Sequence, residues 1–385
     1  MTPSPHRERT LARTPLGAFA LLIVSASMAQ AGALDRTGQP VTILFEDGNF
    51  VELGYAATMP HVDGTFAGSV DSGSMAPDYS LGFFGLKYDV TDRLSLALTV
   101  DEPFGADVDY DESEAGYPLA GSEADFRTRS VTALARYRIN EAFSVHGGLR
   151  YVEVDADLTV NALTATPAGP ALVSYDSEYD SDGDTGYVVG AAYERPAIAL
   201  RVALTYSSKL EYDNEARYTV TSPLGAQAGS GPTVYELPQS VNLDFRIGVP
   251  PSISRDTAVI AGVRWVDWSE TEINTPGYPF GEPVVDYDGD YVTYVLGLGR
   301  RFTDQFSALA SVAYEDGIGG PVSNLSPTDG QVALIVGGSY ALGNRIELGA
   351  AVRYARLGDA TTQTIGAEFE DNDATSLVLR VGYRF

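Results

Sequence analysis

The last ten residues, Ser376 to Phe385, constrain the fold more than any other stretch of the chain. Apolar side chains occupy every second position there, and the positions between them include Arg380 and Arg384. A period of two indicates a β-strand with one apolar and one polar face. A soluble sandwich buries its apolar face, whereas a transmembrane barrel turns it towards lipid and ends it with aromatic residues. The aromatic end at Tyr383 and Phe385 therefore favours a transmembrane barrel.

The N-terminus has the features of a secretory signal peptide. Arg7, Arg9 and Arg13 form a basic start, and Leu16–Val24 is a short apolar core. Ala29-Gln30-Ala31 then matches the small-x-small pattern of a cleavage site. The apolar core is too short to span a bilayer as a helix. We therefore expect cleavage before Gly32 and export of the mature chain to the periplasm.

Composition narrows the class of protein further. Cysteine is absent, which excludes disulfides, thiolate metal sites and cysteine nucleophiles. The formal net charge of −27 argues against nucleic acid as a partner, because the two would repel each other. The chain is still 44% hydrophobic, with 23 Tyr and 15 Phe, so it does not have the composition of a disordered protein.

The alternating pattern recurs at fourteen places, and closed bacterial barrels have an even number of strands. The expected strands are residues 49–60, 79–90, 93–100, 125–140, 142–157, 184–194, 197–212, 238–249, 256–270, 288–302, 305–315, 330–341, 344–357 and 374–385. We therefore predict an all-β fold, a transmembrane antiparallel β-barrel of about 14 strands, over residues 49–385. A signal peptide (1–31) and a short N-terminal plug segment (32–48) precede the barrel.

The connections between these strands alternate in length. Short turns fall at 91–92, 140–141, 195–196, 249–255, 303–304 and 342–343. Long loops fall at 61–78, 101–124, 158–183, 213–237, 271–287, 316–329 and 358–373. Outer-membrane barrels combine short periplasmic turns with long extracellular loops. We therefore expect a monomer in the outer membrane of a Gram-negative bacterium, in contact with membrane lipid and lipopolysaccharide.

Arginines gather on the polar faces of the predicted strands. A charge facing lipid at mid-membrane would cost about 2–4 kcal/mol, so these side chains must face the lumen. The guanidinium group can bind a carboxylate with two parallel hydrogen bonds, or it can pair with acidic side chains across the lumen. The candidate ligand-binding arginines are Arg136, Arg150, Arg264, Arg301, Arg353 and Arg380.

Aromatic residues in the predicted long loops form the second group of candidate ligand contacts. Exposed apolar groups need a surface to bury against. A capture groove for an amphipathic ligand would bury them, and so would the packing of one loop against another. The candidates in this group are Phe104, Tyr117, Tyr278 and Phe280.

No catalytic constellation stands out, and we expect neither an enzyme nor a cofactor. His146 and Ser144 share one strand face, but two residues along a strand separate them by about 7 Å, which favours a polar lumen residue over a hydrolase. The run from Asp176 to Asp184 carries an acid at every second position. It lacks the glycine and the final glutamate of an EF-hand. We interpret it as a solvated acidic loop, with a loose divalent-cation site as the alternative.

Two stretches resemble the long-chain fatty acid transporter family of outer-membrane proteins (FadL/OMPP1/TodX type). One is Leu237-Pro-Gln-Ser-Val-Asn-Leu-Asp-Phe-Arg-Ile-Gly248, followed by Ala261-Gly-Val-Arg-Trp-Val-Asp-Trp-Ser269. The other is Ala313-Tyr-Glu-Asp316, followed by Leu325-Ser-Pro-Thr-Asp-Gly330 and Leu334-Ile-Val-Gly-Gly-Ser-Tyr340. The resemblance is good over 235–385 and only architectural over 49–234. It implies fourteen strands and a channel that takes up hydrophobic or amphipathic small molecules, with long-chain fatty acids as the first expectation.

The N-terminal part departs from that family. Members usually carry a hatch of about forty residues with an Asn-Pro-Ala motif, whereas only residues 32–48 precede the first expected strand here. The family's gating through the hatch is therefore not carried over. The alternative function is a general diffusion porin with a water-filled pore. The final Phe385 is similar to the C-terminal signal of outer-membrane proteins, so the barrel assembly machinery is an expected partner.

Overall fold

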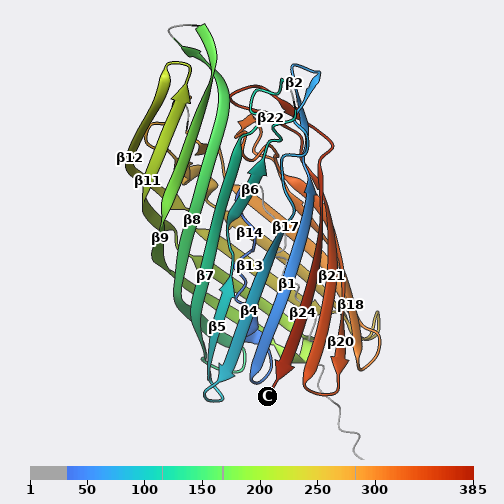
Figure 1. Ribbon diagram of the computed structural model, residues 1–385. Coiled ribbons are helices and arrows are strands. Elements are labelled where there is room, and N and C mark those ends of the chain that lie inside the picture. The colour runs from blue at the N-terminus through green and yellow to red at the C-terminus, as the bar shows by residue number, and fades with distance from the viewer. Residues whose placement is uncertain (1–32, 115, 167–168, 282) are drawn as a thin grey trace, which may run out of the picture.

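The computed structural model describes residues 33–114, 116–166, 169–281 and 283–385, and these residues form one closed β-barrel (Figure 1). The predicted signal peptide lies outside the described residues. In the described part, fourteen strands make up the wall. They are β1 (Phe50–His61), β4 (Tyr79–Asp89), β5 (Leu94–Asp101), β7 (Glu123–Arg138), β8 (Phe143–Thr166), β9 (Gly169–Arg195), β10 (Leu200–Ser207), β13 (Ser240–Gly248), β14 (Thr257–Val266), β17 (Tyr291–Arg301), β18 (Phe306–Glu315), β20 (Gln331–Leu342), β21 (Ile346–Leu357) and β24 (Asp373–Arg384).

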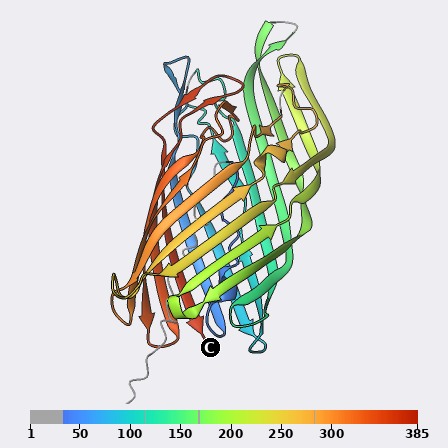
Figure 2. The ribbon, with the colours of Figure 1, turned by 180° about the vertical axis from the view of Figure 1, so that it is seen from behind.

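Consecutive wall strands pair antiparallel, and the first and last strands close the barrel. β1 lies beside β24 over its whole length, from Phe50 opposite Arg384 to His61 opposite Asp373. The short turns lie at one end of the barrel together with the C-terminus, and the long loops lie at the other end (Figures 1 and 2). Among the described residues, no helix is long and apolar enough to span a membrane.

The remaining elements are short, apart from two 13-residue strands over 210–237, and they lie inside the barrel or at its long-loop end, apart from the 3-10 turn at 196–198 between β9 and β10. They are η2 (Thr42–Phe45), η3 (Pro196–Ile198), η4 (Trp268–Glu270), β2 (Gly64–Phe66), β3 (Val70–Asp71), β6 (Gly105–Asp109), β11 (Leu210–Ser222), β12 (Gly225–Leu237), β15 (Glu272–Ile273), β16 (Val285–Asp286), β19 (Pro321–Val322), β22 (Ala360–Thr362) and β23 (Glu368–Phe369).

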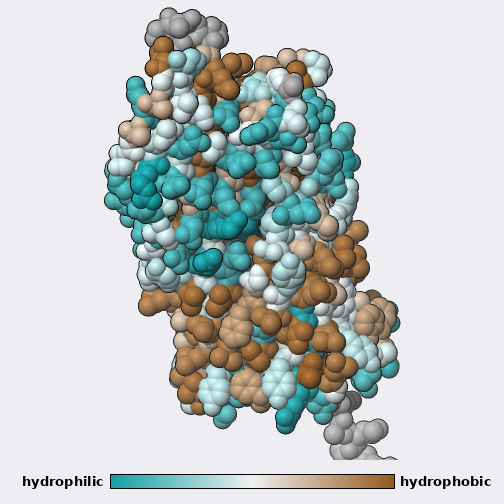
Figure 3. Space-filling view, viewed as in Figure 1, coloured by the Kyte–Doolittle hydropathy of each residue, from teal (hydrophilic) through white to brown (hydrophobic). Residues whose placement is uncertain are grey.

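The outer surface of the wall is apolar and the lumen is polar, the reverse of a soluble barrel. On β24, Leu379 is 49% exposed on the outside, whereas its neighbour Arg380 is 8% exposed in the lumen. On the face shown in Figure 3, apolar side chains gather over the short-turn half of the molecule, below a mostly hydrophilic upper half. This distribution is that of a barrel whose lower part is surrounded by lipid.

Two regions that the sequence analysis assigned to loops, 158–183 and 213–237, are mostly strand. β8 and β9 continue far above the apolar band, and β11 and β12 form a second tall hairpin (Figure 1). The single strand expected at 197–212 is divided into β10 and β11. Apart from the longer β8 and β9, the other expected strands agree to within four residues at each end.

The reason for this error is visible on β9. Asp176, Glu178 and Asp180 are exposed, whereas Val173, Tyr175 and Ser177 are buried. The alternation therefore continues above the membrane, but there the outward face is acidic and not apolar. Acids at every second position were interpreted as a solvated loop, although they are the outer face of a strand.

Candidate functional site

A cavity of about 120 Å³ lies inside the barrel, between the N-terminal segment (residues 33–48) and the wall around β1, β4 and β5. We call it the inner cavity. Its apolar lining residues include Val41, Ile43, Ala56, Leu81, Phe83, Leu134, Val188 and Val378. Its charged lining residues are Arg36, Arg150, Arg380, Glu46, Glu52 and Asp101.

A second cavity of about 130 Å³ lies nearer the long loops, and we call it the outer cavity. The start of the N-terminal segment, β6 and the loop over 325–330 enclose it. Its lining mixes apolar and polar groups, among them Leu34, Val62, Met75, Tyr79, Asp107, Val108, Leu325 and Gln331.

The barrel wall is interrupted beside both cavities. β4 pairs with β5 only from Phe84 opposite Val100 down to the turn, so residues 79–83 of β4 have no strand partner on that side within the described chain. Opposite this gap, one extra residue between β5 and β6 shifts the register against β7. Such a bulge bends a strand away from its neighbour. Gly82 faces outward in the gap and also lines the inner cavity, so the cavity reaches the wall.

The N-terminal segment is fixed inside the lumen by polar contacts. The buried Asp35 carboxylate accepts a hydrogen bond of 2.7 Å from Nε of Arg264. Arg150 donates to the side-chain oxygen of Gln39, and the Thr37 hydroxyl donates to Asp101 at 2.8 Å. The segment therefore plugs the barrel, and η2 buries its apolar side chains below the inner cavity.

All six candidate arginines are hydrogen-bonded to other side chains. In five of them the partners are Glu194 for Arg136, Asp35 for Arg264, Asp256 for Arg301, Gln331 for Arg353, and both Glu52 and Glu347 for Arg380. Of these five, only Arg380 lines the inner cavity. These contacts hold the lumen together, which is the structural role that the sequence analysis left open.

Arg150 differs from the other five. It is 2% exposed, and it is the candidate that lines the inner cavity while its hydrogen bonds go to an amide and a backbone oxygen. Its guanidinium donates to Gln39 and to the backbone oxygen of Ser208, and its buried Nε has no hydrogen-bond partner among the described residues. Arg150 is therefore the candidate arginine best placed to meet a ligand.

Each of the candidate aromatics packs against another aromatic ring. Tyr117 stacks on Tyr110 at 5.3 Å between ring centroids, and Tyr278 meets Phe280 edge-on at 5.2 Å. Burial raises the pKa of Tyr117 to about 12. Phe104 lies at the bulge between β5 and β6, where its ring meets Trp268. Tyr278 and Phe280 also line a small cavity of about 30 Å³ among the loops.

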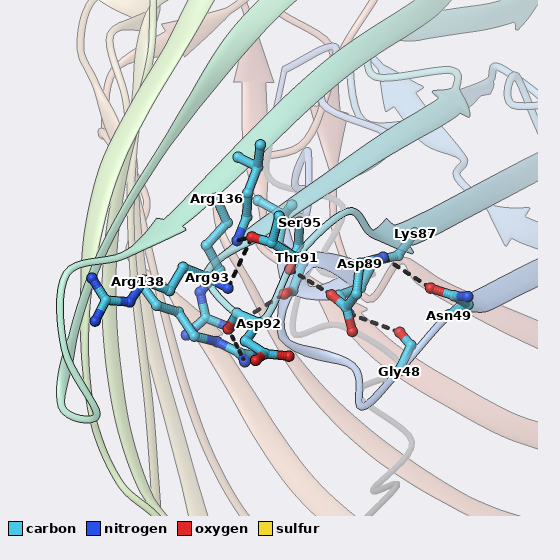
Figure 4. Close-up of polar contacts among 12 residues, drawn as sticks. Gly48, Asn49, Lys87, Asp89, Thr91, Asp92, Arg93, Ser95, Arg136 and Arg138 are labelled. Carbon is cyan, nitrogen blue, oxygen red and sulfur yellow. Dashed lines mark hydrogen bonds and ion pairs between the residues drawn. The ribbon is translucent and has the colours of Figure 1, made fainter.

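Sequence reasoning missed Lys87, which is fully buried in the lumen near the short turns (Figure 4). Its ammonium donates to the backbone oxygen of Gly48 at 2.7 Å and to Asp89 at 2.6 Å. The backbone N–H of Asp89 donates to the side-chain oxygen of Asn49. Lys87 thus fixes the point where the N-terminal segment enters β1. Its inward position in an alternating strand was the signal that would have identified it.

The remaining polar candidates show no chemistry of their own. His146 shares a hydrogen bond of 2.9 Å with Thr205, and Ser144 accepts one from Arg136. No group of three or more acidic or histidine side chains suited to a metal ion occurs in the part of the chain that the structure describes.

The family model for the outer membrane protein transport protein family (OMPP1/FadL/TodX) matches residues 44–385. The chain belongs to this family. It is therefore an outer-membrane channel for hydrophobic molecules and not an enzyme, and its bacterium is Gram-negative. The short turns face the periplasm and the long loops face the outside. Membership favours the hydrophobic channel over the diffusion porin.

The chain has the same fold as several solved structures. A Pseudomonas aeruginosa FadL homologue superposes with a TM-score of 0.75 at 15% identity, over 90% of this chain and 92% of that one. The Pseudomonas putida toluene transporter TodX gives 0.68 at 13% identity, over 90% and 92%. The CymD monoaromatic hydrocarbon channel gives 0.63 at 16% identity, over 94% and 97%. A comparison with curated proteins gives no match.

Proposed function

We propose that this channel imports compact, uncharged hydrophobic molecules, of about the size of a single aromatic ring. The observation that carries the proposal is the inner cavity of about 120 Å³ with its largely apolar lining. An engineered apolar cavity of about 150 Å³ binds benzene, so the inner cavity is of the right size for one ring. A long acyl chain is several times larger.

The charge of the inner cavity supports an uncharged cargo. Three acidic and three basic side chains line it, so the set is balanced without a ligand. Arg380 is bonded to Glu52 at 2.9 Å, and Arg36 is bonded to Asp107. A carboxylate would add an unbalanced charge to this low-dielectric site, whereas a hydrocarbon adds none.

The charge of the outer surface supports the same cargo. The protein carries a net charge of −27, and acids such as Asp176, Glu178 and Asp180 face outward on the tall extracellular hairpin. A surface of one sign repels ligands of the same sign and lowers their association rate. Fatty acid anions would be repelled there, and neutral molecules would not.

The gap in the wall provides an exit from the inner cavity. Cargo that enters between the extracellular loops passes the outer cavity, reaches the inner cavity and leaves past Gly82 into the membrane. Entry transfers apolar surface from water into an apolar environment, at about 25 cal/mol per Å², and the later steps keep that surface out of water. No energy source beyond partition into lipid is needed.

Long-chain fatty acids, the expectation from the sequence, are the second candidate. Arg150 favours them, because its buried Nε has no partner and its guanidinium borders the inner cavity. A carboxylate bound there would be charge-assisted, and the acyl chain would extend through the wall gap. The solved structures of similar fold do not decide between the two cargoes.

Uptake into a Gram-negative host without its own hydrophobic channel tests the proposal. Labelled toluene and labelled oleate are supplied separately, with this gene present or absent, and with Arg150→Gln as a third strain. We expect the gene to raise toluene uptake more than oleate uptake, with Arg150→Gln leaving toluene uptake unchanged. Oleate uptake that exceeds toluene uptake and collapses in Arg150→Gln would establish the fatty acid function instead.

A further inference from the structure

One side chain separates the two cavities. Arg36 lines both the inner and the outer cavity, and no other residue does so in the part of the chain that the structure describes. Its side chain is 6% exposed, although it stands between two cavities of about 120 and 130 Å³. Arg36 therefore lies where the two cavities meet.

The side chain of Arg36 is held across the passage by three contacts. Its guanidinium lies 4.3 Å from the ring centroid of Tyr79 and bonds to the carboxylate of Asp107. The Nε–Cζ end of its side chain lies against Gly105, where an added Cβ would come within 2.5 Å of Nε. Tyr79 on β4 and Asp107 on β6 belong to the two sides of the wall gap.

The backbone on either side of Arg36 is held independently of its side chain. The Arg36 N–H donates to the oxygen of Pro103 at 2.9 Å, and the Gly105 N–H donates to the oxygen of Leu34 at 2.8 Å. Asp35 is fixed by its ion pair with Arg264, and Thr37 by its bond to Asp101. Turning the Arg36 side chain about its own bonds breaks none of these contacts.

We propose that the Arg36 side chain is a valve that opens between the two cavities while the N-terminal segment stays docked. Opening breaks the Asp107 ion pair and the contact with Tyr79, and it moves the guanidinium into the outer cavity. This inference rests on the proposed route through both cavities. It assigns the control of passage to one side chain and not to displacement of the plug.

Thiol labelling tests the valve without using any cargo. The chain has no cysteine, so Ala56→Cys places a single thiol in the inner cavity. Intact cells are treated with methanethiosulfonate ethyltrimethylammonium, a charged reagent that does not cross lipid and so cannot enter through the wall gap. The labelling rate is compared in the Ala56→Cys background with and without Arg36→Ala, and with and without Asp107→Asn.

We expect Arg36→Ala and Asp107→Asn each to speed labelling at least tenfold. The matched control is Ala106→Cys in the outer cavity, whose labelling rate should not change with Arg36→Ala. An unchanged rate at position 56 in Arg36→Ala would overturn the valve. So would an increase in Arg36→Ala that Asp107→Asn does not reproduce, because the passage would then not depend on the Asp107 bond. Failure of the proposed cargo would appear separately, as absent toluene uptake by the unaltered protein.

Discussion

Replacing Asp35 by alanine should release the plug from the barrel lumen. The Asp35 carboxylate is fully buried and accepts a 2.7 Å hydrogen bond from Arg264, whose side chain is 9% exposed. Removing one partner of a buried ion pair typically costs about 3–5 kcal/mol, because the remaining charge is left uncompensated. Every 1.4 kcal/mol is about a factor of ten in an equilibrium constant. We therefore expect the docking equilibrium to shift by about 10²–10³-fold towards the undocked segment.

Single-channel recording in planar bilayers measures this shift. Once the segment has left the lumen, the barrel conducts ions, so Asp35→Ala should open frequently where the unaltered protein stays closed. The double variant Asp35→Ala with Arg264→Met also removes the guanidinium that Asp35→Ala leaves unpaired. This channel should therefore be closed for most of the recording. Asp371→Ala, which breaks an exposed pair with Arg356, is the control and should stay closed. A closed Asp35→Ala channel, or a double variant as leaky as the single one, would refute this account of the plug.

Three further predictions concern the wall, the loops and the C-terminus. Gly82→Phe should abolish toluene uptake, because an added Cβ there meets no atom within 4 Å and the ring has room to fill the wall gap. Ala57→Phe, on β1, which is paired on both sides, should leave toluene uptake unchanged. Initial uptake rates of the two variants test this. Because burial raises the pKa of Tyr117 to about 12, above that of an exposed tyrosine, the loop packing should be fully stable below pH 10 and weaken as the pH rises towards 12. A difference ultraviolet titration against Tyr117→Phe would show this, and a step near pH 10 would contradict it. Deleting Phe385 should lower the amount of folded barrel in the outer membrane, measured by heat-modifiable gel mobility, and an unchanged amount would exclude its role in assembly.

The wall of the barrel could be predicted from the sequence because lipid imposes a strict pattern. Outward positions such as Leu379 must be apolar and inward ones such as Arg380 are free to be charged, so the register follows from the residues. Above the membrane both faces of a strand are allowed to be polar. The outward side chains of β9 are acidic, so this strand lacks the alternation of apolar and polar residues by which the membrane strands were recognised. The tall hairpins were therefore predicted as loops.

The partners of the lumen side chains could not be predicted, because they are distant in the sequence. Arg264 and Asp35 are 229 positions apart and meet only after the barrel closes around the plug. Alternation identified Arg150 as facing the lumen but did not show that it lines the inner cavity and is hydrogen-bonded to Gln39. Arg36 stood in a segment without periodicity, so nothing in its surroundings suggested a place between two cavities.

Crystals soaked with bromobenzene would test the central claim most directly, since the anomalous signal of bromine locates the bound ring. The account predicts a bromine peak in the inner cavity, beside Leu81 and Phe83 and within reach of Arg150. A peak confined to the lipid-facing wall or to the extracellular loops, with the inner cavity unoccupied at saturating ligand, would contradict it.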